Sequence, residues 1–185
     1  MRERRLISLI YFLTLVGILV WIGAIFLAPY LRGHSKTWNV FVYAIFSPIC
    51  HQVPSRSFFF FGYPLAVCGR CLGIYSGFLL GVCLYPFVRG FSAVSLPKTR
   101  IFILISLPIV ADTIGNFLNL WNTPNLARFG TGFLWGTILP FYFITGLMDA
   151  VRDFRQKEAS LQSALNLECL STKKFLEIQS KNRIE

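Results

Sequence analysis

The chain has 185 residues and a mean hydropathy of +0.59. Hydrophobic residues make up 55% of it and charged residues only 14%, against about 25% charged residues in an ordinary soluble domain. A soluble fold of this size cannot hide so much apolar chain, because its surface must be largely polar. The composition therefore indicates an all-α, polytopic integral membrane protein and excludes secreted globules, cytosolic enzymes and nucleic-acid-binding domains as its main body.

The net charge of +10 does not indicate a nucleic-acid partner. Lys and Arg residues cluster beside the apolar runs, as topology signals and headgroup contacts do, so the expected partner is the lipid bilayer. With both termini inside, nine basic residues near the span ends face the cytoplasm and five face outward. We therefore expect a protein of the cytoplasmic (inner) membrane with both termini in the cytoplasm.

Four apolar runs are long enough to cross a hydrocarbon core of about 30 Å. The first extends from Leu6 to Ala28 without a charge, which is too long for the apolar region of a cleaved signal peptide, about 7–15 residues. The other spans are expected at residues 71–88, 101–120 and 131–148. Their short linkers carry Gly, Pro and Asn, so these spans should pack as antiparallel neighbours.

Two further segments are expected to be helical without crossing the membrane. Residues 38–49 are apolar at helical spacing but would extend only about 20 Å, which predicts a short helix in the outer interface. Residues 149–185 have seven basic and six acidic side chains and form the expected cytoplasmic tail, a weakly amphipathic helix.

The loop from residue 50 to residue 71 contains three of the five cysteines and one of the two histidines. Pro64 after Gly62-Tyr63 predicts a chain reversal that brings the later cysteines back to the first. Two thiolates in a Cys-x-x-Cys pair can share one ion, and four ligands complete a tetrahedral set. The candidate ligands for zinc or another transition metal are Cys50, His51, Cys68 and Cys71.

Two other interpretations of these cysteines stay open. Outside the cytoplasm cysteines tend to be oxidised, so a plain disulfide can clamp the loop to the second span. Alternatively, a helix N-terminus and Arg70 favour thiolates, and Cys50 can then exchange disulfides with Cys68 or Cys71. Cys83 and Cys169 are expected to be ordinary residues in every case.

The loop and the span after it resemble a known family. Cys-His-Gln-x-x-x-Arg-Ser-Phe begins at Cys50 and Val-Cys-x-Arg-Cys-x-Gly-Ile-Tyr-x-Gly begins at Val67. Both are similar to the signature of the bacterial predicted membrane proteins catalogued as domain of unknown function 2085. The resemblance extends to about Gly136 and implies a fold but no activity; the family's later block reads Asp-Gly, whereas here Thr113 follows Asp112.

Glycines in two predicted spans are spaced for close helix packing. Small residues four apart lie on one helix face and let two backbones approach in lipid. These residues are Gly69, Gly73, Gly77 and Gly81 in the second span and Gly132 and Gly136 in the fourth.

Asp112 is the one acidic residue between Glu3 and Asp149, and it lies within the third predicted span. A carboxylate in a membrane usually faces a bundle interior or a cavity. Its role is either an interhelical hydrogen-bond network or a ligand site. The predicted ligand pocket beside the cysteines consists of Arg56, Arg70, Asp112, Asn116 and Arg128.

These features predict a membrane protein that binds a metal or small ligand at the membrane surface, or handles its redox state. One alternative is an enzyme analogous to the four-helix membrane thiol oxidoreductases that pass electrons between a Cys-x-x-Cys pair and a quinone. Another is a structural or assembly factor in which a disulfide clamps the loop.

Overall fold

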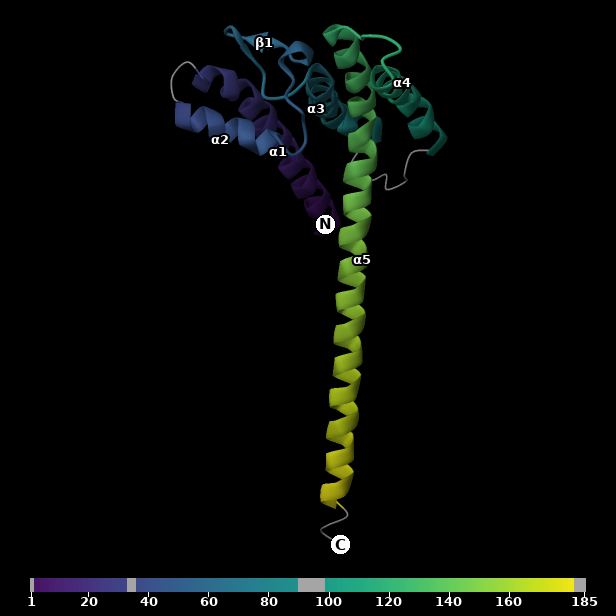
Figure 1. Ribbon diagram of the computed structural model, residues 1–185. Helices are drawn as coiled ribbons and strands as arrows, with labels where there is room; N and C mark the ends of the chain where they lie inside the picture. Colours follow the sequence, from purple (N-terminus) through teal and green to yellow (C-terminus); the bar gives the residue numbers. More distant parts are fainter. Residues whose placement is uncertain (1, 33–35, 90–98, 182–185) are drawn as a thin grey trace. The chain divides into compact units, whose positions relative to one another are not determined.

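The computed structural model describes residues 2–32, 36–89 and 99–181 (Figure 1). Five α-helices account for most of this part of the chain: α1 (Arg2–Arg32), α2 (Lys36–Phe46), α3 (Gly69–Arg89), α4 (Thr99–Phe117) and α5 (Asn125–Lys181). Between α2 and α3 lie a 3-10 turn, η1 (Pro54–Arg56), and a small hairpin of β1 (Phe59–Phe60) and β2 (Tyr63–Pro64). The predicted all-helical class is confirmed.

Among the described residues, four helices are long and apolar enough to cross a membrane, in agreement with the predicted number of spans. The candidate spans are Arg5–Arg32, Gly69–Val88, Thr99–Phe117 and Asn125–Glu168. Each overlaps one predicted span. The linker at residues 90–98 and the loop residue His34 lie outside the described residues.

The third span ends three residues before the predicted Leu120, because a capping motif stops α4. Asn119 has a left-handed backbone with φ of 55°, and the Leu120 N–H donates to the Gly115 carbonyl at 2.9 Å. This is the Schellman pattern, in which an Asn or Gly closes the last helical turn. The Trp121 ring then packs directly on Gly115, where a Cβ would lie 2.0 Å from the ring.

The short helix α2 lies against α1. Its 11 residues extend about 16 Å, roughly half of a hydrocarbon core. Asn39 Nδ2 donates to the Ala28 carbonyl of α1 at 2.9 Å, and Val42 and Phe46 are buried. Trp38 and Phe41 are exposed, which is compatible with the predicted helix in the outer interface.

Residues 147–181 form a second compact unit, which is helical as far as Lys181. Every side chain between residues 153 and 168 is exposed. Within this unit the helix therefore has no buried face over those residues.

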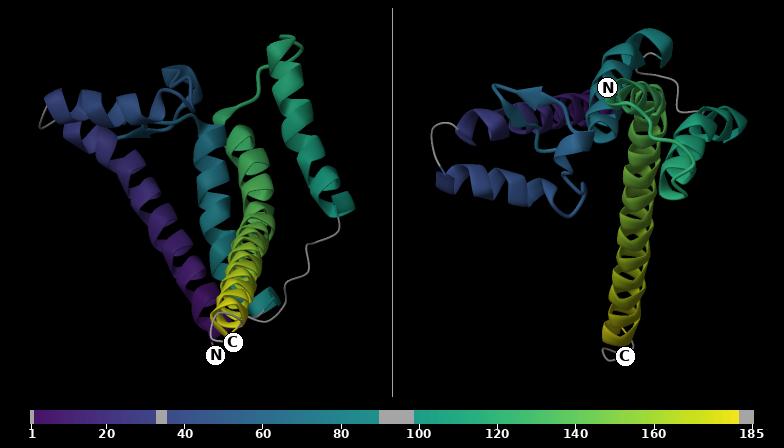
Figure 2. Two further views of the ribbon diagram at one scale, coloured as in Figure 1. Left: turned by 90° about the horizontal axis from the view of Figure 1, so that it is seen from below. Right: turned by 45° about the horizontal axis from the view of Figure 1, so that its top comes forward.

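In the first compact unit, residues 1–146, α3 and α5 run side by side with their backbones in contact (Figure 2). A Cβ added at Gly77 would lie 2.2 Å from the Phe133 carbonyl oxygen, and one at Gly136 would lie 2.2 Å from the Ile74 carbonyl oxygen. Only glycine permits so close an approach. The glycines at this contact are Gly73, Gly77, Gly81, Gly132 and Gly136. At the end of the contact, a Cβ added at Gly69 would lie 3.1 Å from the Asn125 carbonyl oxygen.

We predict that Gly77→Ala lowers the melting temperature of the protein in detergent by several degrees. The added methyl group would force α3 and α5 apart, and overpacking of this kind costs about 1–3 kcal/mol. Gly17→Ala is the matched control, since a Cβ there meets nothing within 4 Å in the described structure. Equal melting temperatures for the two variants would contradict the contact.

Candidate functional site

A tight hairpin places the second and third cysteines opposite the first. Phe59 pairs with Pro64 and Phe60 pairs with Tyr63, which leaves Phe61 and Gly62 as a two-residue turn. Both have positive φ, 51° and 78°, as a type I′ turn requires. The predicted reversal is present and is centred on these two residues.

Gln52 ties the cysteine loop to its neighbours on both sides, a role that the sequence analysis missed. Its side-chain Nε2 donates to the Tyr43 carbonyl at 2.7 Å and to the Ala66 carbonyl at 3.0 Å. The Tyr43 hydroxyl in turn donates to the carbonyl of Pro64 in β2. The sequence feature that could have indicated this role is the position of Gln52 directly after Cys50-His51.

The three cysteines of the loop meet at the start of α3. Cys50 follows α2 and is 6% exposed, Cys68 directly precedes α3, and Cys71 lies in its first turn. Their sulfurs all lie within 4.8 Å of one another, and all three are free thiols. Sulfurs around a tetrahedral zinc ion with Zn–S bonds of about 2.3 Å lie about 3.8 Å apart. The group can therefore hold a metal ion.

Hydrogen bonds converge on these sulfurs. The Cys68 N–H donates to Cys50 Sγ at 3.1 Å, and the backbone N–H groups of Arg70 and Cys71 donate to Cys68. Hydrogen bonds from the Cys50 thiol, and then from the Cys71 thiol, lower the pKa of Cys68 to about 2. The pKa of Cys50 is raised, first because its own thiol is bonded to Cys68. These pKa shifts favour ionisation of Cys68 before Cys50.

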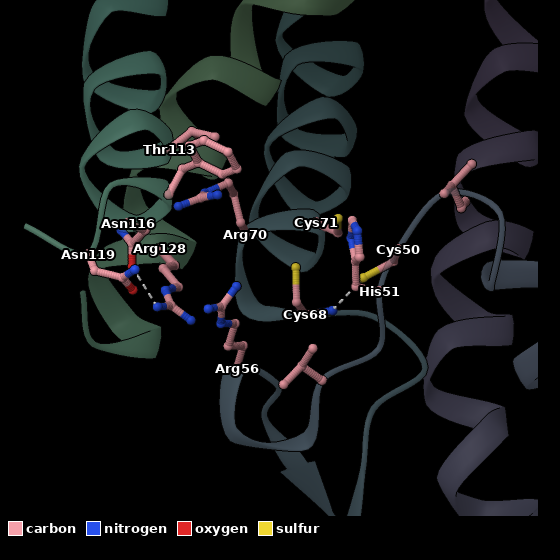
Figure 3. A pocket seen from close by; sticks show the side chains of 13 residues that line it. Cys50, His51, Arg56, Cys68, Arg70, Cys71, Thr113, Asn116, Asn119 and Arg128 are labelled. Carbon is pink, nitrogen blue, oxygen red and sulfur yellow. Dashed lines mark hydrogen bonds between the residues drawn. The ribbon is translucent and has the colours of Figure 1, made fainter. Parts of the chain in front are cut away.

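The predicted fourth ligand is not part of the sulfur group. His51 is exposed and lines the same cavity as the cysteines (Figure 3). Its ring nitrogens fall outside the set of mutually close ligand atoms. Cys83 is exposed on α3 and also lies outside this set, and the side chain of Cys169 is not among those described.

The cysteines open onto a cavity of about 520 Å³. Four of the five residues predicted for a ligand pocket line it: Arg56, Arg70, Asn116 and Arg128. The fifth, Asp112, is 7% exposed and lies behind the wall, where it forms an ion pair with Arg70.

A hydrogen-bonded chain joins α3, α4 and α5 beneath the cavity. Asp112 accepts from Asn116 Nδ2 at 3.0 Å, and Asn116 Oδ1 accepts from Arg128 Nη2 at 2.8 Å. The hydroxyl of Thr123, which the sequence analysis did not select, donates to Asp112 Oδ1. A buried carboxylate is stabilised by such donors, so the predicted network is present and forms one wall of the pocket.

Comparison with known proteins agrees with this architecture. Residues 50–142 match the sequence profile of the family described as predicted membrane protein, DUF2085. The chain belongs to this family. The three cysteines of the loop, the arginines that line the cavity and the glycines of the α3–α5 contact all lie within the matched segment.

Relatives in the DUF2085 family occur in archaea, so the family is not confined to bacteria. An uncharacterized protein of Methanocaldococcus jannaschii is 38% identical over 140 residues, which are 72% of the chain and 90% of that protein. An uncharacterized protein of Methanothermobacter thermautotrophicus is 33% identical over 90 residues, which are 47% of the chain and 77% of that protein. No solved structure matches the chain.

We predict that the reduced, metal-free protein carries about one thiolate per molecule at pH 6, measured by thiolate absorbance near 240 nm. Ordinary thiols, with pKa values near 8.5, are neutral at that pH, whereas the lowered pKa of Cys68 keeps it ionised. Cys68→Ser should remove this absorbance and Cys83→Ser should leave it. A wild-type signal that appears only above pH 8 would contradict the hydrogen-bonded cluster.

Proposed function

We propose that Cys50, Cys68 and Cys71 form a metal centre at the extracytoplasmic surface of the membrane, beside a pocket for a small ligand. Zinc is the expected ion, and another transition metal with a preference for sulfur is compatible with the same ligands. The observation that carries the proposal is the convergence of three sulfurs within 4.8 Å at the head of one helix.

The backbone around the sulfurs supports a metal centre over a disulfide clamp. A disulfide clamp needs two cysteines and gives the third no role, whereas here each sulfur lies close to the other two. N–H groups directed at sulfur stabilise thiolates, which are the form that binds metal. Neither feature contributes to a neutral disulfide.

A set of three cysteines leaves one coordination position for another group. His51 lines the cavity next to the sulfurs, and rotation of its side chain can bring an imidazole nitrogen to the ion. Water or a ligand from the cavity is the other candidate. Structural zinc sites have four protein ligands, whereas sites that act on ligands keep one position open. The open position therefore favours a ligand-binding role.

The extracytoplasmic placement follows from charge and from the number of spans. Nine basic residues against five favour both termini inside. The candidate span in α1 precedes the cysteine loop, so a single crossing places the loop on the opposite side. An impermeant thiol reagent should label the cysteine loop in intact cells after a chelator removes the metal. Labelling only after cell lysis would contradict this orientation.

A membrane thiol oxidoreductase is the second candidate, and the lowered pKa of Cys68 is the observation that favours it. A thiolate of a reduced partner would attack a disulfide between Cys68 and Cys71 and displace Cys68 as a thiolate, directly or through Cys50, until the partner carries the disulfide and Cys68 and Cys71 are both reduced. The electrons would pass to a quinone in the membrane, the acceptor used by the analogous four-helix enzymes.

Single Cys→Ser changes at positions 50, 68 and 71 should each remove most of the bound metal, measured by elemental analysis of purified protein. Loss of any one thiolate opens the coordination shell, so the three losses should be similar. A His51→Ala change should have an equal or weaker effect. Cys83→Ser is the matched control, because Cys83 lies outside the sulfur group, and it should keep the metal.

The same variants separate the alternatives. If the wild-type protein contains no metal and the Cys50→Ser variant traps a disulfide between Cys68 and Cys71, the redox relay replaces the metal centre as the explanation. If the protein contains no metal and one of the three cysteines can be replaced without effect, the disulfide clamp is the remaining explanation. In that case reduction should lower the stability by about 2–5 kcal/mol.

A further inference from the structure

Three arginines from three separate elements surround one side of the cavity. Arg56 belongs to η1, and Arg70 and Arg128 lie in the first turns of α3 and α5. All three line the cavity, and Arg128 is close enough to both others to experience their positive charge. Figure 3 shows the side chains of Arg56 and Arg128 directed toward each other.

The guanidinium of Arg128 is buried and makes no direct ion pair among the described residues, although the charge of Asp112 acts on it from a longer distance. Arg128 is only 4% exposed, and its Nη2 donates to the neutral amide oxygens of Asn116, at 2.8 Å, and Asn122, at 3.3 Å. Its Nε and the Nε of Arg70 have no hydrogen-bond partner among the described residues. A buried charge is costly unless it is paired, so these N–H groups indicate a missing acceptor.

The cavity has more positive charge than its own groups neutralise. Asp112 pairs with Arg70, and no Asp or Glu is among the described residues that line the cavity. Even with a thiolate at Cys68, three arginines exceed the negative charges by one. A zinc ion with three thiolates carries the same single negative charge, so the excess does not depend on the metal. The N-termini of α3 and α5, which begin beside the cavity, add partial positive charge.

We infer that the cavity binds the oxyanion of a phosphoryl group between Arg56, Arg70 and Arg128. Guanidinium groups match the oxygens of phosphate with pairs of parallel hydrogen bonds. The apolar side chains of Ile49 and Phe117 also line the cavity and can contact the carbon portion of a phosphate ester. The inference names the chemical class of the ligand for the proposed pocket, and it does not require the metal.

The phosphoryl group has two sources, a soluble phosphate ester or the headgroup of a phospholipid. Both are tested with purified full-length protein in detergent by its melting temperature. One arm adds inorganic phosphate, compared with sodium chloride at equal ionic strength. The other adds phosphatidylglycerol, compared with diacylglycerol, which has the same chains without the phosphate.

Arg56→Gln is the test variant because Arg56 is exposed and its loss should not unfold the protein. Arg100→Gln is the matched control, since Arg100 is an exposed arginine outside the cavity lining. Arg56→Lys keeps the positive charge but lacks the planar guanidinium that forms paired hydrogen bonds, so the affinity of this variant for the phosphoryl group should be intermediate. Bound metal is measured in the same samples and should be equal in all of them.

Phosphate or phosphatidylglycerol should raise the melting temperature of the wild type and of Arg100→Gln. In Arg56→Gln the concentration needed for the same rise should increase about tenfold or more, as expected for one lost charge-assisted hydrogen bond. Stabilisation by phosphate alone identifies a soluble ligand, and stabilisation by phosphatidylglycerol alone identifies a headgroup. The inference is overturned if neither probe stabilises the wild type beyond its control, or if Arg56→Gln responds like the wild type. If the bound metal is unchanged in that case, the proposed metal centre is not contradicted by the failure of the phosphoryl inference.

Discussion

The backbone contact between α3 and α5 determines where the functional groups lie. Glycines on both helices leave no side chain between the backbones where they face each other, so the carbonyl of one helix lies close to the Cα of the other. The contact begins where Gly69, at the start of α3, lies beside the Asn125 carbonyl at the start of α5, so the first turns of the two helices are side by side. Cys71 and Arg70 on one helix therefore open onto the same cavity as Arg128 on the other.

Charge compensation in an apolar surrounding is the second constraint. A lone carboxylate in a membrane is expensive, and Asp112 is stabilised by Arg70, Asn116 and Thr123. The ion pair links α4 to α3, although α4 has few buried residues of its own. Because the apolar surrounding has a low dielectric constant, burial of guanidinium N–H groups without acceptors also costs free energy. The polar groups therefore link α3, α4 and α5, while the Nε atoms of Arg70 and Arg128 have no acceptor among the described residues.

Much of this architecture follows from sequence patterns, and what escapes them depends on backbone geometry. Uninterrupted apolar runs predict the spans, and glycines four apart predict a packing face, because both signals are periodic and local. The end of α4 is not predictable from hydropathy, because the left-handed Asn119 stops the helix within an apolar run. The Gln52 contacts and the Thr123 hydroxyl join residues that are distant in sequence, and their roles emerge only when the loop is folded. The displacement of His51 from the sulfur group has the same origin, since adjacent residues in an irregular loop point in different directions.

The central claim is that three cysteines act as one centre, and it is tested most directly by counting the sulfur atoms around the bound ion. X-ray absorption of the zinc-loaded wild-type protein at the zinc edge measures this number and the bond lengths without any mutation. The account predicts three sulfur neighbours at about 2.3 Å and one lighter neighbour, nitrogen or oxygen, at about 2.0–2.1 Å. Two or fewer sulfur neighbours, or a shell of oxygen and nitrogen alone, would contradict it.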